Sequence, residues 1–404
     1  MKFLIIEQDL RVSGTSQGII SRSFLAKLRK AYPDSLIDVH YIKAEDSIDK
    51  LDLLPVNNLI EYRVNVTLPL LIKYINKIYW RIFNVSLGEE WVIKQYAKII
   101  AKIDYKSYDH IFIRSAGIAH ETILATLNLP ILKKAIVNFH DPFPVSWYVG
   151  TTLKPTPLDF NRLAKMMKVV EDAKVCTSTA SYMSHDLQHL YGSKKPFLTL
   201  PHQFDPKIFD ISDSSKVRTK EKPVSISYHG ALMFGRNIGN LIKGYSDLLA
   251  SDQKYVDNTE LVLRVKGNQV AKYIEIYKDA PNIKFLPTID FSNSSNEQIY
   301  QSDIVIILEN GPHYCNILVG KAPFLASINK AVLCISPKKS ELRTIISDNR
   351  CIADMEDKDE IKLKLKELVD NELNNSPTIR PFGDYFSQTN FKYQLDKILH
   401  LDDR

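Results

Sequence analysis

The sequence of 404 residues lacks the features that mark membrane-spanning or metal-stabilised proteins. Its four cysteines form no C-x-x-C pair, and none lies near a histidine at the spacing of zinc ligands. No run of ~18 uncharged apolar residues occurs, so no segment is expected to cross a bilayer as a helix. These absences favour a reducing compartment and no structural zinc, and we expect a cytoplasmic protein.

The N-terminus and the overall charge exclude two further classes. The apolar run after Lys2 reaches Glu7 after only four residues, which is too short for a signal peptide. The formal net charge of +6 is small for this length and does not indicate a nucleic-acid partner. With 45% hydrophobic and 25% charged residues, the composition is typical of a globular protein, and the length predicts two domains of ~150–200 residues.

Short apolar runs alternate with helical patterns, which predicts parallel strands joined by helical crossovers. The strands are expected at 3–6, 36–42, 111–113 and 135–139, and then at 224–228, 261–265, 283–286, 304–308 and 331–335. A charged stretch at 210–223 separates the two series and is interpreted as a linker. We therefore predict an α/β protein with two Rossmann-like, doubly wound domains, 1–222 and 223–381, facing across a cleft that binds the ligands. A helical segment within 382–404 is expected to pack back on the first domain.

Residues 68–83 predict an amphipathic helix. Its apolar residues at helical spacing are Leu70, Leu71, Tyr74, Ile75, Ile78, Tyr79 and Ile82. The opposite side carries Lys73, Lys77, Trp80 and Arg81, and a second basic row follows at Lys94, Lys98 and Lys102. Two interpretations remain open: a helix packed on the core with a solvated basic face, or a peripheral contact with an anionic membrane at the inner face of the cell membrane.

The clearest local pattern is SISYHGALMFGRNIGNLIKGYSDLL, where a strand enters a loop containing Gly230 and then a helix. Arg236 and Asn237 lie at the start of that helix. Backbone N–H groups at a helix N-terminus, together with a guanidinium, can hold a diphosphate that leaves with negative charge. The alternative is an ordinary turn whose arginine meets solvent.

This segment and four later ones resemble, in order, the C-terminal domain of GT-B glycosyltransferases of the retaining, family-four type. The later segments are LVLRVKGN, NIKFLPTIDF, EQIYQSDIVIILEN and GKAPFLASINKAVLCISP. The resemblance covers about half of the chain. It implies a nucleotide-sugar donor, linked to UDP or GDP, on the second domain. The residues implied to contact this donor are Gly230, Arg236, Asn237, Pro287, Glu309, Asn316 and Lys321, together with Gly14 from the first domain.

The resemblance breaks at two glutamates that family members carry eight positions apart. The corresponding positions here are Asn316 and Phe324, and neither is acidic. Glu309, at a strand end, either substitutes as a ribose or sugar contact or is simply a strand-end glutamate at the surface. The identity of the donor and the stereochemistry of transfer therefore stay open.

Polar residues also follow the expected strands of the first half. Gly14 lies in the loop EQDLRVSGTSQG after the first strand, where it allows close approach to a phosphate or sugar. His140 and Asp141 follow the strand at 135–139 and are the candidate catalytic residues. The alternatives are a buried, satisfied histidine and an aspartate that caps a turn. Arg114, Ser115 and His120 follow another strand and could line the acceptor side.

Neither a metal nor another cofactor is expected, because no Asp-x-Asp triplet follows an expected strand. The resulting hypothesis is a metal-independent glycosyltransferase that modifies a glycan or lipid-linked glycan in polysaccharide or glycoconjugate synthesis. A nucleotide-sugar epimerase or a phosphorylase of the same fold is the first alternative, and a sugar-nucleotide-binding protein without catalysis is the second. A dehydrogenase is disfavoured because no G-x-G-x-x-G follows the first strand.

Overall fold

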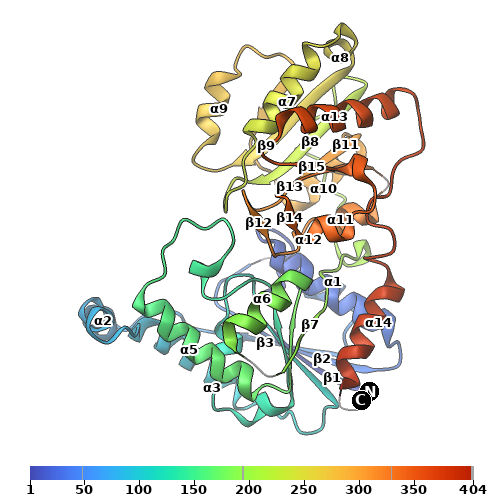
Figure 1. Cartoon of the computed structure of the whole chain (residues 1–404). Coiled ribbons are helices and arrows are strands. Elements are labelled where there is room, and N and C mark those ends of the chain that lie inside the picture. The colour runs from blue at the N-terminus through green and yellow to red at the C-terminus, as the bar shows by residue number, and fades with distance from the viewer. Residues whose placement is uncertain (48, 193–194, 329, 402–404) are drawn as a thin grey trace. The chain divides into compact units, whose positions relative to one another are not determined.

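The computed structural model describes residues 1–47, 49–192, 195–328 and 330–401, which divide into two compact units. The first unit comprises Met1–Tyr148, Thr152–Phe204 and the chain from Ser387 onward. The second comprises Val149–Thr151 and Asp205–Phe386. Each unit is built around its own parallel sheet (Figure 1).

The first sheet has seven strands in the order β3-β2-β1-β4-β5-β6-β7, and all neighbours are parallel. The strands are β1 Lys2–Glu7, β2 Leu36–Lys43, β3 Asn58–Arg63, β4 His110–Arg114, β5 Ala135–Phe139, β6 Val175–Ser178 and β7 Phe197–Thr199. Phe3 to Ile6 are fully buried, as expected for a parallel strand that is covered on both faces.

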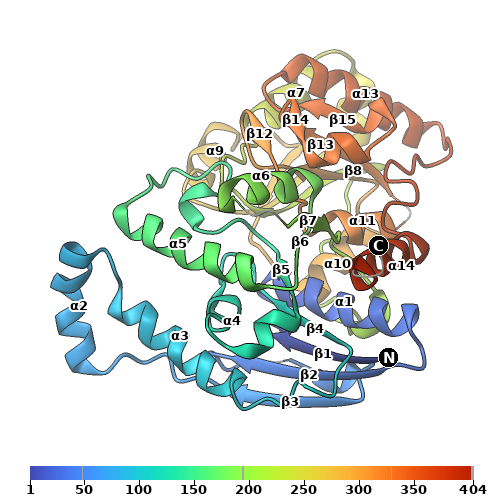
Figure 2. The same cartoon turned by 60° about the horizontal axis from the view of Figure 1, so that its bottom comes forward.

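The first unit also contains helices. They are α1 Ser16–Ala31, α2 Leu70–Phe83, α3 Leu87–Ile100, α4 Glu121–Leu124, α5 Pro157–Asp172, α6 Ser181–Tyr191 and α14 Gln388–Leu399. Helix α14 packs beside α1, and the rings of Phe24 and Phe391 lie 6.1 Å apart (Figure 2). The C-terminal helix thus belongs to the core of the first unit, because Leu395 and Ile398 are buried in the same cluster as Phe3.

The second sheet has six strands in the order β10-β9-β8-β11-β13-β15, again all parallel. Its strands are β8 Val224–Ala231, β9 Thr259–Lys266, β10 Ile283–Leu286, β11 Ile304–Leu308, β13 Ala331–Ser336 and β15 Ile352–Asp354; the short pair β12 Tyr314–Cys315 and β14 Lys339–Ser340 lies apart. In chain order this is 3-2-1-4-5-6, the doubly wound arrangement. The first sheet has the same order with one added edge strand. The prediction of two Rossmann-like α/β domains is confirmed.

The helices of the second unit are α7 Gly239–Leu249, α8 Gln253–Asn258, α9 Val270–Ile276, α10 Phe291–Tyr300, α11 Ala322–Ser327, α12 Glu341–Ile345 and α13 Lys358–Leu373. Helices α7 and α13 lie side by side over one face of the sheet (Figure 1). The second unit begins at Asp205, earlier than the predicted boundary at 222. The reason is that the expected linker is bound to this unit: Arg218 pairs with Glu260 at 2.7 Å and Lys220 with Asp303 at 2.8 Å.

Helix α2 corrects one expectation. No residue of α2 is buried, and Leu70, Leu71 and Ile78 are among the most exposed apolar side chains in the described part of the chain. The apolar stripe therefore does not pack on the core. Trp80 is half-buried instead, on the side of the helix that meets the rest of the unit.

Candidate functional site

The carboxyl ends of β8 and β11 mark the point in the second sheet where the strand order reverses. In doubly wound sheets, ligands bind at such a switch point. Gly230 lies at the end of β8, Glu309 directly follows β11, and Lys321 directly precedes α11. Three residues predicted to contact the donor thus lie in or directly beside elements at this switch point.

Lys321 approaches the backbone of β8 closely. Its ammonium nitrogen lies 4.5 Å from the ring centroid of Tyr228 and donates a hydrogen bond to the carbonyl oxygen of His229. A Cβ atom at Gly230 would lie 2.9 Å from Oη of Tyr228 and 3.2 Å from Nζ of Lys321. Glycine at position 230 therefore makes room for both groups.

Arg236 is held by the loop that follows β11. Its Nε donates to Oδ1 of Asn310 at 3.0 Å, and Nδ2 of Asn310 donates to the carbonyl oxygen of Val149 at 3.2 Å. Gly235 has φ +78°, and a Cβ there would lie 2.1 Å from the carbonyl oxygen of Gly311. The loops after β8 and β11 therefore pack backbone against backbone, which fixes the position of the guanidinium.

Arg236 and Lys321 bring two basic side chains close enough to interact electrostatically. Burial, reinforced by the positive charge of Arg236, lowers the pKa of Lys321 to about 7. No carboxylate of the described residues forms an ion pair with either side chain, although ion pairs occur nearby, as between Arg264 and Glu297. Two uncompensated cations beside a strand end can bind a diphosphate, and its charge would restore the protonated form of Lys321.

The other predicted donor residues are placed differently. Oδ1 of Asn237 accepts hydrogen bonds from the N–H of Gly239 and from Oη of Tyr273, each at 2.7 Å, so this carboxamide caps the start of α7. Pro287 is exposed, and its carbonyl oxygen accepts from Arg264 at 2.9 Å. Asn316 is only 5% exposed. Of these three, Asn237 and Pro287 are exposed and Asn316 is buried.

Glu309 is fully buried and is not a surface residue of the strand end. The N–H of Leu342 donates to its Oε1 at 3.5 Å. Burial raises the pKa of Glu309 to about 7, although the hydroxyl groups of Ser336 and Ser340 oppose this shift. Its carboxyl group therefore faces the protein interior beside β13, which argues against the ribose or sugar contact considered for it.

A buried ion pair beneath the same strand end has no local sequence signal. Arg264 donates to both carboxylate oxygens of Glu297, at 2.6 and 2.7 Å. Nε2 of His229 lies 3.5 Å from Glu297, while Nδ1 is 2.9 Å from Oγ of Ser294. Burial, together with the charges of Lys321 and Arg264, lowers the pKa of His229 to about 3. These groups pack against the end of β8. Their pairing could not be predicted from the sequence because they are far apart along the chain.

In the first unit, the ends of β1, β4 and β5 bring together Glu7, Arg114 and His140. Arg114 forms an ion pair with Oε1 of Glu7 at 2.5 Å and donates to Nε2 of His140 at 2.9 Å. Its Nε donates to Oδ1 of Asn138 at 3.1 Å. The guanidinium is only 3% exposed and all of these contacts face inward. Arg114 is therefore a positioning residue for His140, contrary to the expectation that it lines the acceptor side.

The tautomer of His140 follows from this contact. Because Arg114 is a donor only, Nε2 of His140 must accept, and the ring proton resides on Nδ1. Nδ1 of His140 is buried and has no partner among the described residues. Burial, followed by the charge of Arg114, lowers the pKa of His140 well below its ordinary value. His140 is thus a neutral imidazole with one buried N–H group that has no partner among the described residues, which suits hydrogen bonding better than proton abstraction.

Asp141, Ser115 and His120 surround this histidine. Oη of Tyr148 donates to Oδ1 of Asp141 at 2.9 Å, and Ser115 accepts from the N–H of His140 at 2.9 Å. His120 lies between the carbonyl oxygens of Ile118 and Asp141, each 3.1 Å from one ring nitrogen, and burial lowers its pKa to about 4. All three are buried around His140, and His120 also lines a cavity of the first unit.

Gly14 lies in the exposed loop between β1 and α1. It has φ +86°, and a Cβ built there would meet no atom within 4 Å. The loop is braced by Asp9, which accepts from the N–H of Arg11 at 3.0 Å and from Oγ1 of Thr15 at 3.0 Å. Position 14 thus requires glycine for its backbone conformation and leaves the space above it open.

The comparisons with known proteins agree with the fold. No family model matches the sequence, and no curated protein matches it. Solved structures do match: sucrose-phosphate synthase from Thermosynechococcus elongatus has a TM-score of 0.62 at 11% identity, over 100% of this chain and 96% of that chain. The fold is of the GT-B type.

Two further GT-B structures cover the whole chain. A lipopolysaccharide outer core galactosyltransferase aligns with a TM-score of 0.55 at 12% identity, over 100% of both chains. The UDP-GlcNAc 2-epimerase from Neisseria meningitidis, bound to UDP-GlcNAc, has a TM-score of 0.54 at 11% identity, over 98% of this chain and 100% of that chain. At these identities the likeness establishes the fold, while the activity must be argued from the residues.

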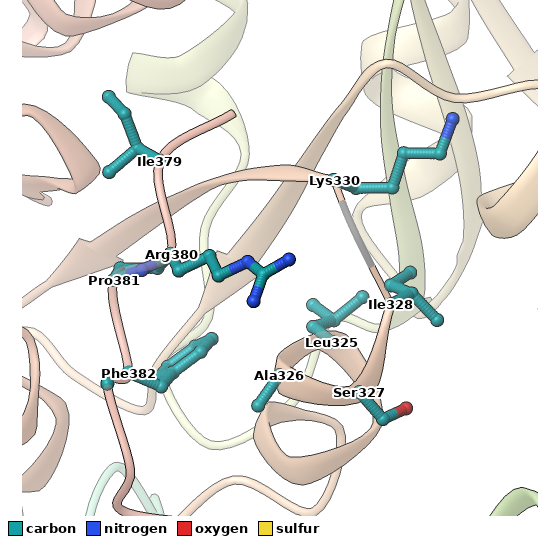
Figure 3. A pocket seen from close by; sticks show the side chains of 10 residues that line it. Leu325, Ala326, Ser327, Ile328, Lys330, Ile379, Arg380, Pro381 and Phe382 are labelled. Carbon is teal, nitrogen blue, oxygen red and sulfur yellow. The ribbon is translucent and has the colours of Figure 1, made fainter. Parts of the chain in front are cut away.

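Each unit also contains a cavity. In the first unit, a cavity of about 470 Å³ is lined mainly by apolar side chains, with His120, Glu121 and Arg162 among them. In the second unit, a cavity of about 210 Å³ lies between the end of α11 and the segment 379–383 (Figure 3). Arg380 points into this space and Lys330 points away from it. None of the residues that line this second cavity is a predicted site residue. The cavity lies at the C-terminal end of α11, whereas Lys321 precedes the N-terminal end of that helix.

No group of three or more histidine, cysteine, aspartate or glutamate side chains that could hold a metal ion occurs in the described ranges. Within the same ranges, no helix is long and apolar enough to cross a membrane.

Proposed function

We propose that the chain is a glycosyltransferase that takes a sugar from a UDP- or GDP-linked donor and transfers it, with retention of configuration, to a glycan or lipid-linked glycan. The observation that carries this proposal is the pair of uncompensated cations, Arg236 and Lys321, at the switch point of the second sheet. The match to GT-B structures that include a galactosyltransferase and a sucrose-phosphate synthase supports it.

In this proposal Arg236 and Lys321 bind the diphosphate of the donor. Negative charge develops on the diphosphate as the glycosidic bond breaks, and preorganised cations stabilise that charge more in the transition state than in the ground state. Lys321 gains most from this, because burial and the charge of Arg236 lower its pKa in the free form, and a bound diphosphate would oppose both effects. The two cations would replace a metal ion, so we propose that catalysis is metal-independent.

From the first unit, His140 contributes a neutral N–H donor, which we assign to a hydroxyl of the transferred sugar. Asp141 is not assigned the role of a base, because Tyr148 already donates to its carboxylate and because the residue is buried. Gly14 would admit a sugar or phosphate close to the backbone, since a side chain there would occupy the open space.

The test is nucleotide binding and sugar transfer by the purified protein. A panel of UDP- and GDP-sugars should raise the melting temperature selectively, because a ligand that binds only the folded state stabilises it. Arg236→Ala and Lys321→Ala should each weaken binding of the selected nucleotide by about one to two decades, the value of a charge-assisted hydrogen bond. Lys272→Ala, an exposed lysine on α9, is the matched control and should bind normally. Unchanged affinity in both site variants would remove the proposed diphosphate site.

The products distinguish the alternatives. Transfer of label from the nucleotide sugar to an acceptor supports the proposal. Conversion of the nucleotide sugar to an isomer without an acceptor would instead identify an epimerase, as in the structurally similar UDP-GlcNAc 2-epimerase. Binding without turnover of any donor would indicate a sugar-nucleotide-binding protein.

A further inference from the structure

Helix α2 presents its apolar stripe to solvent. Six apolar residues of one side are between 45% and 71% exposed: Leu70, Leu71, Tyr74, Ile75, Ile78 and Ile82. An amphipathic helix of a globular protein normally buries such a stripe against the core. In both cartoon views α2 projects from the sheet of the first unit, beyond α3 (Figures 1 and 2). A contiguous exposed apolar surface of this kind marks an interaction site.

The orientation of α2 is set by contacts on its other side. Asn76 is half-buried, and its Oδ1 accepts from the N–H of Leu87 at the start of α3 at 2.7 Å. Tyr79 and Trp80 are also half-buried. At Asn84 the chain takes up φ 53° and ends the helix, while its N–H donates to the carbonyl oxygen of Trp80 at 3.0 Å. The exposed stripe is therefore the outward side of an anchored helix and not a frayed segment.

Cations line one edge of the exposed stripe. Helix α2 carries Lys73, Lys77 and Arg81, all exposed, and no acidic residue. Seven residues make about two helical turns. Lys77 therefore lies within ~20° of Leu70 around the axis, and Arg81 lies within ~20° of Tyr74. None of the three cations forms an ion pair with a carboxylate of the described residues; Arg81 lies 4.7 Å from the ring of Trp80.

Helix α3 adds positive charge beside α2. Three lysines are exposed: Lys94 in the middle of α3, Lys98 in its last turn and Lys102 just beyond it. The two acidic residues at the start of α3 are already paired with α5: Glu89 with Arg162 and Glu90 with Lys165. The basic row of α3 is therefore not neutralised by the acids of its own helix.

We propose that α2 is an interfacial anchor that lies in the headgroup layer of an anionic lipid bilayer. Its apolar stripe would enter the boundary between headgroups and acyl chains, and the cations along its edge would contact lipid phosphates. The surface that enters the lipid is thus the apolar stripe. From the sequence alone, the side with Trp80 and the cations was the one expected to contact the membrane. This inference does not depend on the proposed enzymatic activity.

A second copy of the chain fits this surface less well. A symmetric dimer through α2 would place identical surfaces against each other, including the rows of Lys73, Lys77 and Arg81. Like charges brought together in this way oppose association, whereas an anionic bilayer complements the same row.

The test is binding to sedimented vesicles of phosphatidylcholine, alone or mixed with phosphatidylglycerol, over a range of salt. The wild-type chain should bind the anionic vesicles and be released as salt rises. Replacement of Lys73, Lys77 and Arg81 by glutamine should weaken anionic binding by roughly a hundredfold, since each cation adds about a fivefold preference. Replacement of Leu71, Ile78 and Ile82 by glutamine should weaken it by at least tenfold at low salt, where electrostatic attraction persists.

Matched controls keep this test independent of folding and of catalysis. Ile276→Gln with Leu363→Gln removes apolar residues that are 57% and 51% exposed on α9 and α13, and should leave vesicle binding unchanged. Replacement of Lys207, Lys243 and Lys272 by glutamine is the corresponding charge control, since these lysines are exposed outside α2 and α3. All variants should keep the wild-type melting temperature and nucleotide affinity.

Two results would overturn the proposal. The first is equal, negligible binding of the wild-type chain to both kinds of vesicle at low salt. The second is the finding, by sedimentation velocity, that the wild-type chain is a dimer and the variant with glutamine at Leu71, Ile78 and Ile82 is a monomer. In that case neither protein would bind vesicles. That result would assign the stripe to a second copy.

Discussion

Arg114 donates to Nε2 of His140 at 2.9 Å while it also pairs with Glu7 at 2.5 Å. This geometry sets the tautomer of the histidine, and burial together with the charge of the guanidinium lowers the pKa of His140 well below its ordinary value. The candidate catalytic residue is therefore a fixed neutral donor. Two predictions follow from this contact, two from buried charges in the second unit and one from the proposed diphosphate contacts.

His140→Ala should reduce sugar transfer by at least about a hundredfold, the usual contribution of a positioned polar group at a reacting centre. Nucleotide affinity should survive, because Arg236 and Lys321 are untouched. The variant should also lose about 1–3 kcal/mol of stability, since the replacement leaves an Arg114 donor without its partner. Kinetics well below the melting temperature separate the two effects. A stability loss with an unchanged rate of the folded fraction would make His140 purely structural.

Arg114→Met should destabilise the protein by about 3–5 kcal/mol, because it leaves the buried Glu7 carboxylate without a counter-charge. Burial raises the pKa of Glu7 and Arg114 opposes that shift, so loss of the arginine also favours the protonated acid. The double variant Glu7→Gln/Arg114→Met should recover most of the loss. Urea unfolding of the four proteins of this cycle measures the coupling; additive losses would show that the pair contributes no mutual stabilisation.

Donor binding should become weaker as the pH rises above about 7. The pKa of Lys321 is lowered to about 7 from an ordinary value of 10.5, so the free protein loses its proton there, and a bound diphosphate must restore it. For the same reason the free protein should gain stability between these two values as the pH rises, because the unfolded chain holds the proton longer. Calorimetric titration of UDP in buffers of different ionisation enthalpy detects the proton uptake. Lys321→Met should abolish it, and an unchanged pH slope would contradict this assignment.

Glu309→Gln should stabilise the protein at neutral and higher pH. The folded-state pKa of Glu309 is raised to about 7 from 4.5, so the folded protein binds the proton more tightly, and its stability falls as the pH rises through this window. Removing the charge should restore on the order of 2–3 kcal/mol at about pH 8 and little at about pH 5. Thermal melting of the two proteins at both pH values measures the difference. If instead nucleotide affinity falls sharply in this variant while stability does not change, the carboxylate contacts the donor.

Chelation by EDTA should leave the rate of transfer unchanged, because the proposal assigns the leaving diphosphate to Arg236 and Lys321. Magnesium or manganese should not stimulate the enzyme more than other salts of equal ionic strength. A rate that falls on chelation and returns with one divalent metal would contradict the proposed metal independence.

Much of the fold could be predicted from the sequence because parallel strands buried on both faces are nearly continuous apolar runs. Phe3 to Ile6 and Ile304 to Leu308 are examples, and both runs lie in central strands of their sheets. Strands β6 and β7 were not predicted, because VCTS and FLT are short and lack a distinctive pattern. Strand β3 was not predicted either. It forms an edge of its sheet, and its apolar and polar residues alternate instead of forming a continuous apolar run.

What the sequence determined by itself was the order of strands and helices, the α/β class and the residues that follow the strand ends, among them Gly230, Arg236 and His140. These depend on local periodicity and on glycine or polar residues within a few positions of a strand. Only the tertiary structure decided the partners of those residues. Glu7 and Arg114 are 107 positions apart, and Arg236 and Asn310 are 74 apart. It also decided that the stripe of α2 faces outward, because the same periodicity describes a helix that packs on a core and one that does not.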